Sequence, residues 1–198
     1  DADLSSATKT NIFAKELPER FFDIGIAEAN MMGTAAGLAT CGKIPYASTF
    51  AVFAAGRAYD QIRNSICYPN LNVKICATHA GITVGEDGPT HQPVEQLISL
   101  RSIPNLNVYR PIDANEVLGS YKSIFDTREP SVIVLSRNKV NILDSTKVGE
   151  VKNGAYILKE ELKRLDAILI SSGEDAELTL EVANLLTEKG IDTRVVSM

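Results

Sequence analysis

Both histidines of the chain lie in one segment that is rich in glycine and acidic residues. His79 and His91 enclose Asp87 together with three glycines and a proline, within the run THAGITVGEDGPTHQP. Histidine donates and accepts protons near neutral pH, and a loop of this composition brings both rings and the carboxylate to one cavity. A solvated turn is the structural alternative, but both histidines of 198 residues in one loop favour a functional role.

A second candidate is Glu28, in the run GIAEAN that leads into the small-residue stretch MMGTAAGLAT. The predicted helix starts at this residue, and the dipole of a helix stabilises a carboxylate in its first turn. Capping of the helix is the alternative role for Glu28. The spacing by itself leaves both roles open.

Arg137 is a third candidate, because Ser136, Arg137 and Asn138 follow a buried strand. The run Gly85–Gly88 with Asn115 superficially imitates the GDG…N element that holds magnesium in thiamin enzymes, where oxygen ligands suit the metal. We reject this match, since Asn115 is single and stands where it caps a helix. No GxxxxGK[ST] or GxGxxG loop is present, so we predict no metal site and no nucleotide site in this chain.

The elements that position these residues alternate between strand-length apolar runs and amphipathic helices. This pattern predicts the α/β class, with a doubly wound, mostly parallel sheet and helices on both faces. Strands are predicted at FFDIGI, KIPYAST, LNVKICA, NVYRP and SVIVLS, with helices at 28–40, 50–66, 91–100 and 113–125. We expect Glu28, His79, His91 and Arg137 to lie at the carboxyl ends of these strands, where open α/β sheets bind ligands.

The C-terminal part begins a second α/β unit after a polar linker at 137–150. Strands are predicted at GAYILKE, DAILISS and IDTRVVS, with a helix at 175–189. The domains are predicted as 1–143 and 144–198, the second being incomplete. The chain opens and closes as though strands had been cut, so we expect a fragment, a processed chain or missing termini.

Composition excludes several classes of function. The formal net charge of -5 disfavours nucleic-acid binding, which needs clustered Lys and Arg. No run of about 18 apolar residues is present to cross a membrane. Cys41, Cys67 and Cys76 are an odd number without a CxxC pair, which is typical of buried thiols in a reducing compartment. We therefore expect a cytoplasmic protein, although a plastid protein without its transit peptide has the same features.

Several motifs in fixed order resemble the pyrimidine-binding domain of transketolase, most closely the split form made of separate subunits. They are GIAEANMMGTAAGLAT, STFAVFAAGRAYDQIRNSI, THAGITVGEDGPTHQP, RSIPNLNVYRPIDANE and VIVLSRN. The run from GAYILKE to RVVSM resembles the start of the family's C-terminal domain. The resemblance covers essentially the whole chain. It implies transfer of a two-carbon ketol unit between sugar phosphates in the pentose phosphate pathway, with thiamin diphosphate as cofactor.

The resemblance implies a role for each candidate. Glu28 matches the glutamate that hydrogen-bonds the aminopyrimidine and favours the tautomer that takes the thiazolium proton. Phe50 and Phe53 match the aromatic wall of the pyrimidine site, with core packing as the alternative. His79, Asp87 and His91 match family positions that contact sugar hydroxyls and the reacting carbonyl. Arg137 matches an arginine that binds the sugar phosphate, and Asp3 matches an acidic residue near the cofactor.

Two positions depart from the family pattern. A further aromatic residue expected beside the pyrimidine is not matched, and Gly56 stands nearby. The family's phosphate-contacting serine corresponds to Ala7, with Ser6 and Thr8 beside it.

The resemblance also implies partners. Magnesium and the diphosphate are expected on an N-terminal transketolase subunit or domain carrying the true GDG element, in a symmetric assembly with two copies of each. We expect the isolated chain to be inactive. The alternatives are a deoxyxylulose-phosphate synthase, a 2-oxoacid dehydrogenase beta subunit, and a non-catalytic module with the same fold.

Overall fold

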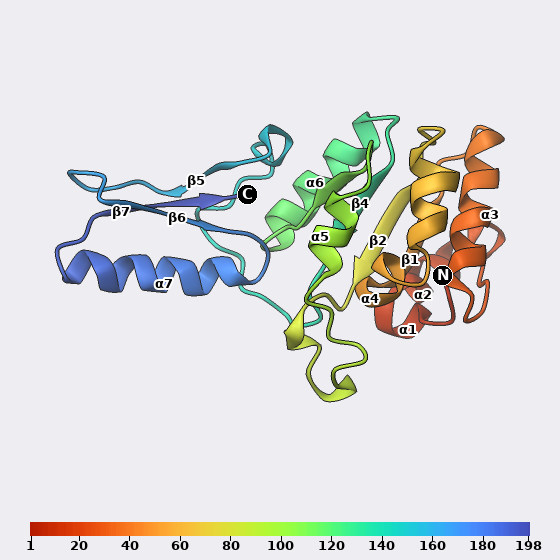
Figure 1. Ribbon diagram of the computed structural model, residues 1–198, viewed down its shortest axis with the longest axis horizontal. Coiled ribbons are helices and arrows are strands. Elements are labelled where there is room, and N and C mark those ends of the chain that lie inside the picture. The colour runs from red at the N-terminus through yellow and green to blue at the C-terminus, as the bar shows by residue number, and fades with distance from the viewer. The chain divides into compact units, whose positions relative to one another are not determined.

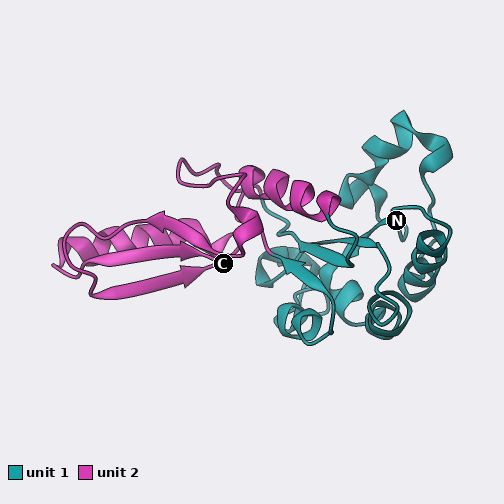
Figure 2. Cartoon of the chain, turned by 90° about the horizontal axis from the view of Figure 1, so that it is seen from above, with its two compact units in different colours: residues 1–109, 127–138 teal, residues 110–126, 139–198 magenta.

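The computed structural model describes residues 1–198, which form two compact units (Figure 2). Unit 1 comprises residues 1–109 and 127–138, and unit 2 comprises residues 110–126 and 139–198.

Unit 1 is built on a parallel sheet of four strands in the order β1-β2-β4-β3 (Figure 1). Its strands are β1 (Tyr46–Phe50), β2 (Lys74–Thr78), β3 (Asn107–Tyr109) and β4 (Ser131–Val134). β2 and β4 are almost entirely buried, as expected for parallel strands that helices cover. The sheet and its helices confirm the predicted α/β class.

Short and medium helices surround this sheet. The largest is α3 (Glu28–Thr40), which packs against β1 and the π-helical segment η2 (Gln61–Cys67). The others are α1 (Ser5–Thr8), α2 (Thr10–Glu16), α4 (Ala51–Ala55), α5 (Gln96–Arg101) and the 3₁₀ turns η1 (Pro18–Arg20) and η3 (Ile82–Asp87). The core between them is made of alanine, isoleucine and valine side chains with Met31 and Met32.

Three predicted elements of unit 1 are wrong or misplaced. The strand predicted at 21–26 is absent, because Gly25 has a φ of +75° and Phe22 is exposed. The helix predicted at 50–66 breaks after α4 at Gly56, where the amide of Ala58 bonds back to the Phe53 carbonyl. The helix predicted at 91–100 begins only at Gln96, since Pro93 lacks the amide hydrogen and disfavours helical backbone before it.

Unit 2 holds a sheet of three strands in the order β5-β7-β6. β5 (Tyr156–Lys159) runs antiparallel to β7 (Thr193–Ser197), and β6 (Ala167–Ser171) runs parallel to it. α7 (Asp175–Glu188) packs against β6 and β7 and buries Ala176 and Ala183. The unit also contains α6 (Ala114–Asp126) and the 3₁₀ turn η4 (Val151–Asn153).

Two buried carboxylates organise the segment around α6. Glu116 accepts hydrogen bonds from the Tyr156 hydroxyl and the Ser197 hydroxyl, each at 2.7 Å, and from the Ile112 amide at 2.8 Å. Burial and the bond to Glu116 raise the pKa of Tyr156 well above its ordinary value. Asp113 accepts from the Leu143 amide at 2.9 Å and from the Thr146 hydroxyl at 2.6 Å. These polar groups are therefore satisfied within the unit.

We predict that Gly119→Ala destabilises the protein, although alanine normally favours a helix interior by about 1 kcal/mol. A Cβ at Gly119 would lie 2.5 Å from the Val148 carbonyl oxygen and 2.6 Å from a Val151 methyl carbon. Because backbone must shift to make room, we expect a loss of about 1–3 kcal/mol in the free energy of unfolding. Urea unfolding measures it.

Gly33→Ala, in the exposed part of α3, is the matched control. No atom lies within 4 Å of a Cβ built there, so a gain of about 0.5–1 kcal/mol is expected. If both variants gain stability, the close approach of α6 to Val148 is not a real constraint.

Candidate active site

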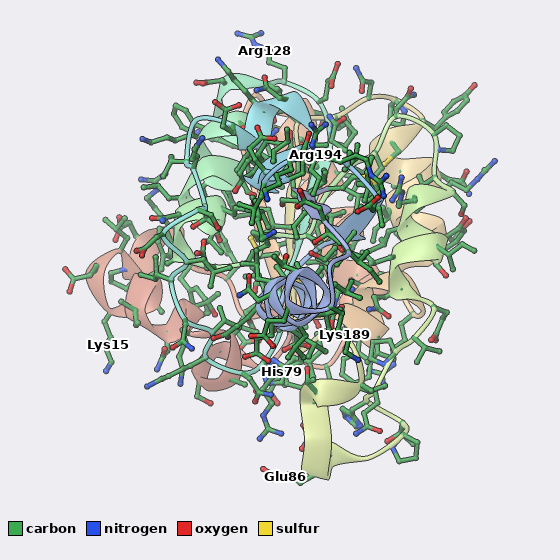
Figure 3. The ribbon with its side chains drawn as sticks, turned by 90° about the vertical axis from the view of Figure 1, so that its left-hand side faces the viewer. Lys15, His79, Glu86, Arg128, Lys189 and Arg194 are labelled. Atoms are coloured by element: carbon green, nitrogen blue, oxygen red, sulfur yellow. The ribbon has the colours of Figure 1, made fainter.

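Three sequence candidates follow the carboxyl ends of strands in unit 1. Phe50 ends β1, His79 follows β2 directly, and Arg137 lies just beyond β4. Phe50 is in register with Thr78, and the strands are parallel, so these residues share one edge of the sheet. Figure 3 shows His79 and Glu86 at the opposite end of the unit from Arg128, which precedes β4. The predicted placement of His79 and Arg137 agrees with this geometry.

Four rings meet at this edge, and we name Phe50, Phe53, His79 and His91 the ring cluster. The rings of Phe50 and His79 stack, with centroids 3.9 Å apart and an interplanar angle of 20°. Phe50 and Phe53 lie 5.9 Å apart, and the His91 ring meets Phe53 edge-on at 5.3 Å. The structure thus brings together both histidines and both phenylalanines that the sequence singled out.

His79 is held in an unusual backbone conformation at the base of the loop. Its φ is +57°, in the left-handed region, which is uncommon for residues other than glycine. Burial lowers the pKa of His79, the positive charge of Arg137 and the nearby His91 lower it further, and Asp87 opposes them. The neutral ring offers one donor and one acceptor nitrogen, and Nδ1 lies 3.0 Å from the Thr78 hydroxyl.

We predict that His79 weakens the fold in mild acid. Because the folded chain lowers its pKa, the unfolded chain binds the proton more readily as the pH falls below about 6.5. The free energy of unfolding then decreases between pH 7.5 and pH 5.5. His79→Gln is expected to reduce this decrease, as measured by urea unfolding at both pH values, whereas an identical decrease in the variant would contradict the assignment.

Glu28 is almost fully buried, at 2% exposure, in the first turn of α3. Its partner is Arg57, whose Nη1 donates to the two carboxylate oxygens at 2.9 and 3.1 Å. The same guanidinium covers the Phe53 ring, with Cζ 4.0 Å from the ring centroid. Arg57 therefore links Glu28 to the Phe53 ring of the ring cluster.

Arg57 is the site residue that sequence reasoning missed. A buried carboxylate requires a counter-charge or hydrogen-bond donors, but the sequence does not indicate which arginine supplies them to Glu28. The helix between Phe53 and Arg57 breaks at Gly56, so the position of Arg57 depends on tertiary structure. The position next to Gly56, where the sequence lacks a further aromatic residue, thus carries a flat cation instead.

The side chain of Arg137 is hydrogen-bonded to the glycine-rich loop. Its guanidinium donates to the Val84 carbonyl and, at 2.8 Å, to Glu86, and it lies 3.7 Å from Asp87. The loop extends from the sheet as the yellow-green segment of Figure 1, with Glu86 at its outer end in Figure 3. Arg137 and Asp87 are therefore brought together, and the arginine orders the segment between the two histidines.

Asp3 lies apart from these residues. It is exposed, its φ is +61°, and its backbone amide donates to Asp23 at 3.0 Å. The buried carboxylate of this region is that of Asp1, which accepts from the hydroxyls of Thr8 at 2.8 Å and Thr10 at 3.0 Å. No contact joins Asp3 to the ring cluster.

No three His, Cys, Asp or Glu side chains are arranged to hold a metal ion. None of the helices combines the length and the apolar character that a bilayer crossing requires.

Comparison with known proteins gives two family matches that together cover nearly the whole chain. Residues 1–142 match the pyrimidine-binding domain of transketolase, and residues 154–198 match the transketolase-like C-terminal domain. The predicted resemblance is therefore confirmed for both parts of the chain.

Individual relatives agree with this match. A putative transketolase C-terminal section from Methanocaldococcus jannaschii is 44% identical over all of this chain and 62% of its own length. A 6-deoxy-6-sulfo-D-fructose transketolase subunit from a Clostridium species is 35% identical, over all of this chain and 61% of its own length. This chain thus spans about three-fifths of the length of these relatives.

A solved structure described as a split gene transketolase, inactive beta4 tetramer, is 48% identical with a TM-score of 0.85. The match covers the whole of this chain and 63% of the chain in that structure. Sequence motifs, the parallel sheet and these matches agree, and the chain belongs to the transketolase family, with matches to its pyrimidine-binding domain and to its C-terminal domain.

Proposed function

We propose that this chain supplies the pyrimidine-side half of a thiamin-diphosphate-dependent transketolase that moves a two-carbon ketol unit between sugar phosphates. The observation that carries the proposal is the buried carboxylate of Glu28, which Arg57 links to the ring cluster at the carboxyl edge of the sheet. A buried carboxylate next to flat aromatic faces is the environment that a heteroaromatic ring with hydrogen-bond donors requires.

The donor set of the site fits the aminopyrimidine of the cofactor. Arg57 is itself a flat group that donates hydrogen bonds to Glu28 and lies over Phe53, so this position accepts groups of that shape and polarity. Glu28, Phe50 and Phe53 would hold the ring. When bound, thiamin diphosphate supplies the stabilisation of negative charge on carbon that ketol transfer requires.

The remaining residues of the edge are proposed to act on the sugar. His79 and His91 would donate or accept protons at hydroxyl and carbonyl oxygens, which suits the neutral ring of His79. Asp87 would accept a hydrogen bond from a hydroxyl group. Arg137 would bind the phosphate in exchange for its present bond to Glu86, whose side chain is 82% exposed.

Asp3 is proposed as a further cofactor contact only on its match to the family position. Its exposed place outside the ring cluster gives this role no support from geometry.

The rest of the enzyme is proposed to come from a partner. An N-terminal transketolase subunit or domain would hold the diphosphate and magnesium through oxygen ligands, which this metal prefers. The relative named a transketolase subunit supports separate chains, and the split gene tetramer supports both separate chains and self-association. Within this layout we propose domains at 1–143 and 144–198, in a cytoplasmic enzyme of the pentose phosphate pathway.

Reconstitution tests the proposal. The protein is purified with an N-terminal transketolase subunit from the same organism, and transfer from a ketose phosphate to an aldose phosphate is followed with magnesium and thiamin diphosphate present. We expect transfer by the mixture and none by either chain alone. A mixture that forms a complex, binds the cofactor and transfers no ketol unit would refute the proposed function.

A further inference from the structure

Arg57 makes two contacts that together occupy the proposed pyrimidine position. Its Nη1 donates to both oxygens of Glu28, and its guanidinium carbon lies 4.0 Å above the centre of the Phe53 ring. The carboxylate and the ring face are the two surfaces that would recognise an aminopyrimidine. Arg57 already contacts both of these surfaces.

The backbone around Gly56 places Arg57 there. α4 ends at Ala55, and the Ala58 amide bonds to the Phe53 carbonyl at 3.1 Å, which is one residue more than an α-helical turn. A Cβ at Gly56 would lie 2.8 Å from the Val52 carbonyl oxygen, so glycine permits this close turn. The position of Arg57 relative to Phe53 therefore follows from the local fold.

The chemistry of the guanidinium explains why Arg57 and an aminopyrimidine would bind at the same position. It is planar, it carries N–H donors in a fixed arrangement, and it stacks on aromatic faces. An aminopyrimidine is also planar and presents polar edge atoms to a carboxylate. We infer that Arg57 is an internal occupant of the pyrimidine position, which the cofactor ring displaces from Glu28 when it binds; this inference rests on the proposed function.

The difference in side-chain exposure indicates that Arg57, and not Glu28, moves when the ring binds. The side chain of Arg57 is 52% exposed, whereas that of Glu28 is 2% exposed. The arginine can turn into solvent at little cost in hydration, while the carboxylate stays fixed in the first turn of α3. Binding of the ring then competes with the ion pair, and the apparent affinity falls by the fraction of molecules in which the position is open.

The test uses the full-length protein and the isolated aminopyrimidine of thiamin, 4-amino-5-hydroxymethyl-2-methylpyrimidine, as the probe. This probe carries no diphosphate, so its binding needs neither magnesium nor the partner. Ligand-observed NMR gives the dissociation constant. We expect Arg57→Met to bind the probe about tenfold more tightly than the wild type, since methionine keeps the apolar stem and removes every donor.

Arg63→Met is the matched control, because Arg63 is an exposed arginine six positions along the same segment, and its side chain bonds Asn64 and not the site. We expect it to bind the probe as the wild type does. Equal or weaker binding by Arg57→Met in the wild-type background would overturn the inference.

A second measurement needs no variant, because Arg57→Met leaves a buried carboxylate unpaired and can fail to fold. In a crystal structure of the wild-type two-chain complex with thiamin diphosphate, Arg57 is expected to have left Glu28. An intact ion pair beside the bound ring would overturn the inference. Ketol transfer by a wild-type complex in which Arg57 stays bonded to Glu28 would contradict this inference alone. Displacement of Arg57 without any ketol transfer would instead contradict the proposed function.

Discussion

Replacing Glu28 with glutamine is expected to lower the turnover of the reconstituted enzyme by about 10²–10⁴-fold, the usual cost of losing a positioned acid–base group. Glutamine keeps an oxygen acceptor for Arg57, so the hydrogen bond that satisfies this buried position is retained and the fold stays intact. It cannot exchange a proton with a ring nitrogen. Turnover is measured at saturating cofactor, and proton exchange at the thiazolium carbon is followed by NMR.

Glu19→Gln provides the control for this change, because Glu19 lies exposed in the short turn η1 and has the same chemistry. Its turnover and its rate of proton exchange are expected to match the wild type. Unchanged exchange in Glu28→Gln would remove the proposed role of this carboxylate.

The elements that were predicted well are those whose signals are local. α3 begins at Glu28 and ends at Thr40 as predicted, since the stretch is rich in alanine and lacks internal breaks. β4 lies within the predicted strand at 131–136, whereas β2 starts later than the predicted strand at 71–77 and ends one residue beyond it. The segment 21–26 has the same apolar character and forms no strand, because strand formation also requires a neighbour to pair with, which no local pattern reveals.

In the candidate site, too, some contacts follow from local sequence and topology, and others depend on tertiary structure. His79 and Arg137 follow strands of one parallel sheet, so topology alone predicts that they approach each other. The stacking of His79 on Phe50 follows from the left-handed backbone at His79, which the residue type does not indicate. The contact of Arg57 with Glu28 joins residues 29 positions apart across a broken helix. Such a contact depends on tertiary structure and lies beyond the reach of periodicity.

Thiamin diphosphate is expected to bind weakly to this chain without its partner. Most of the charge of the cofactor is on the diphosphate, which needs magnesium and oxygen ligands, and no group of acidic or histidine side chains here is arranged to hold a metal. The loop Gly85–Gly88 does not replace such a site, because Glu86 and Asp87 are engaged by Arg137. What remains is a contact with one ring, for which Arg57 competes.

A ring-sized contact of this kind gives a dissociation constant of about 1 mM or weaker, since ordering the cofactor against half a site cancels much of the gain. The partner subunit would add the diphosphate and magnesium contacts. Binding is therefore expected to become tight and magnesium-dependent only when both chains are present.

Calorimetric titration of thiamin diphosphate into the purified chain, into the partner and into their mixture tests the half-site assignment most directly, with magnesium present and then removed by chelation. We expect negligible heat with this chain alone and saturable, magnesium-dependent binding with the mixture. In the mixture, Glu28→Gln should weaken binding while Glu19→Gln should not, because only Glu28 lies beside the ring cluster. Tight magnesium-dependent binding by the isolated chain would contradict the assignment and would show that this chain carries a complete cofactor site.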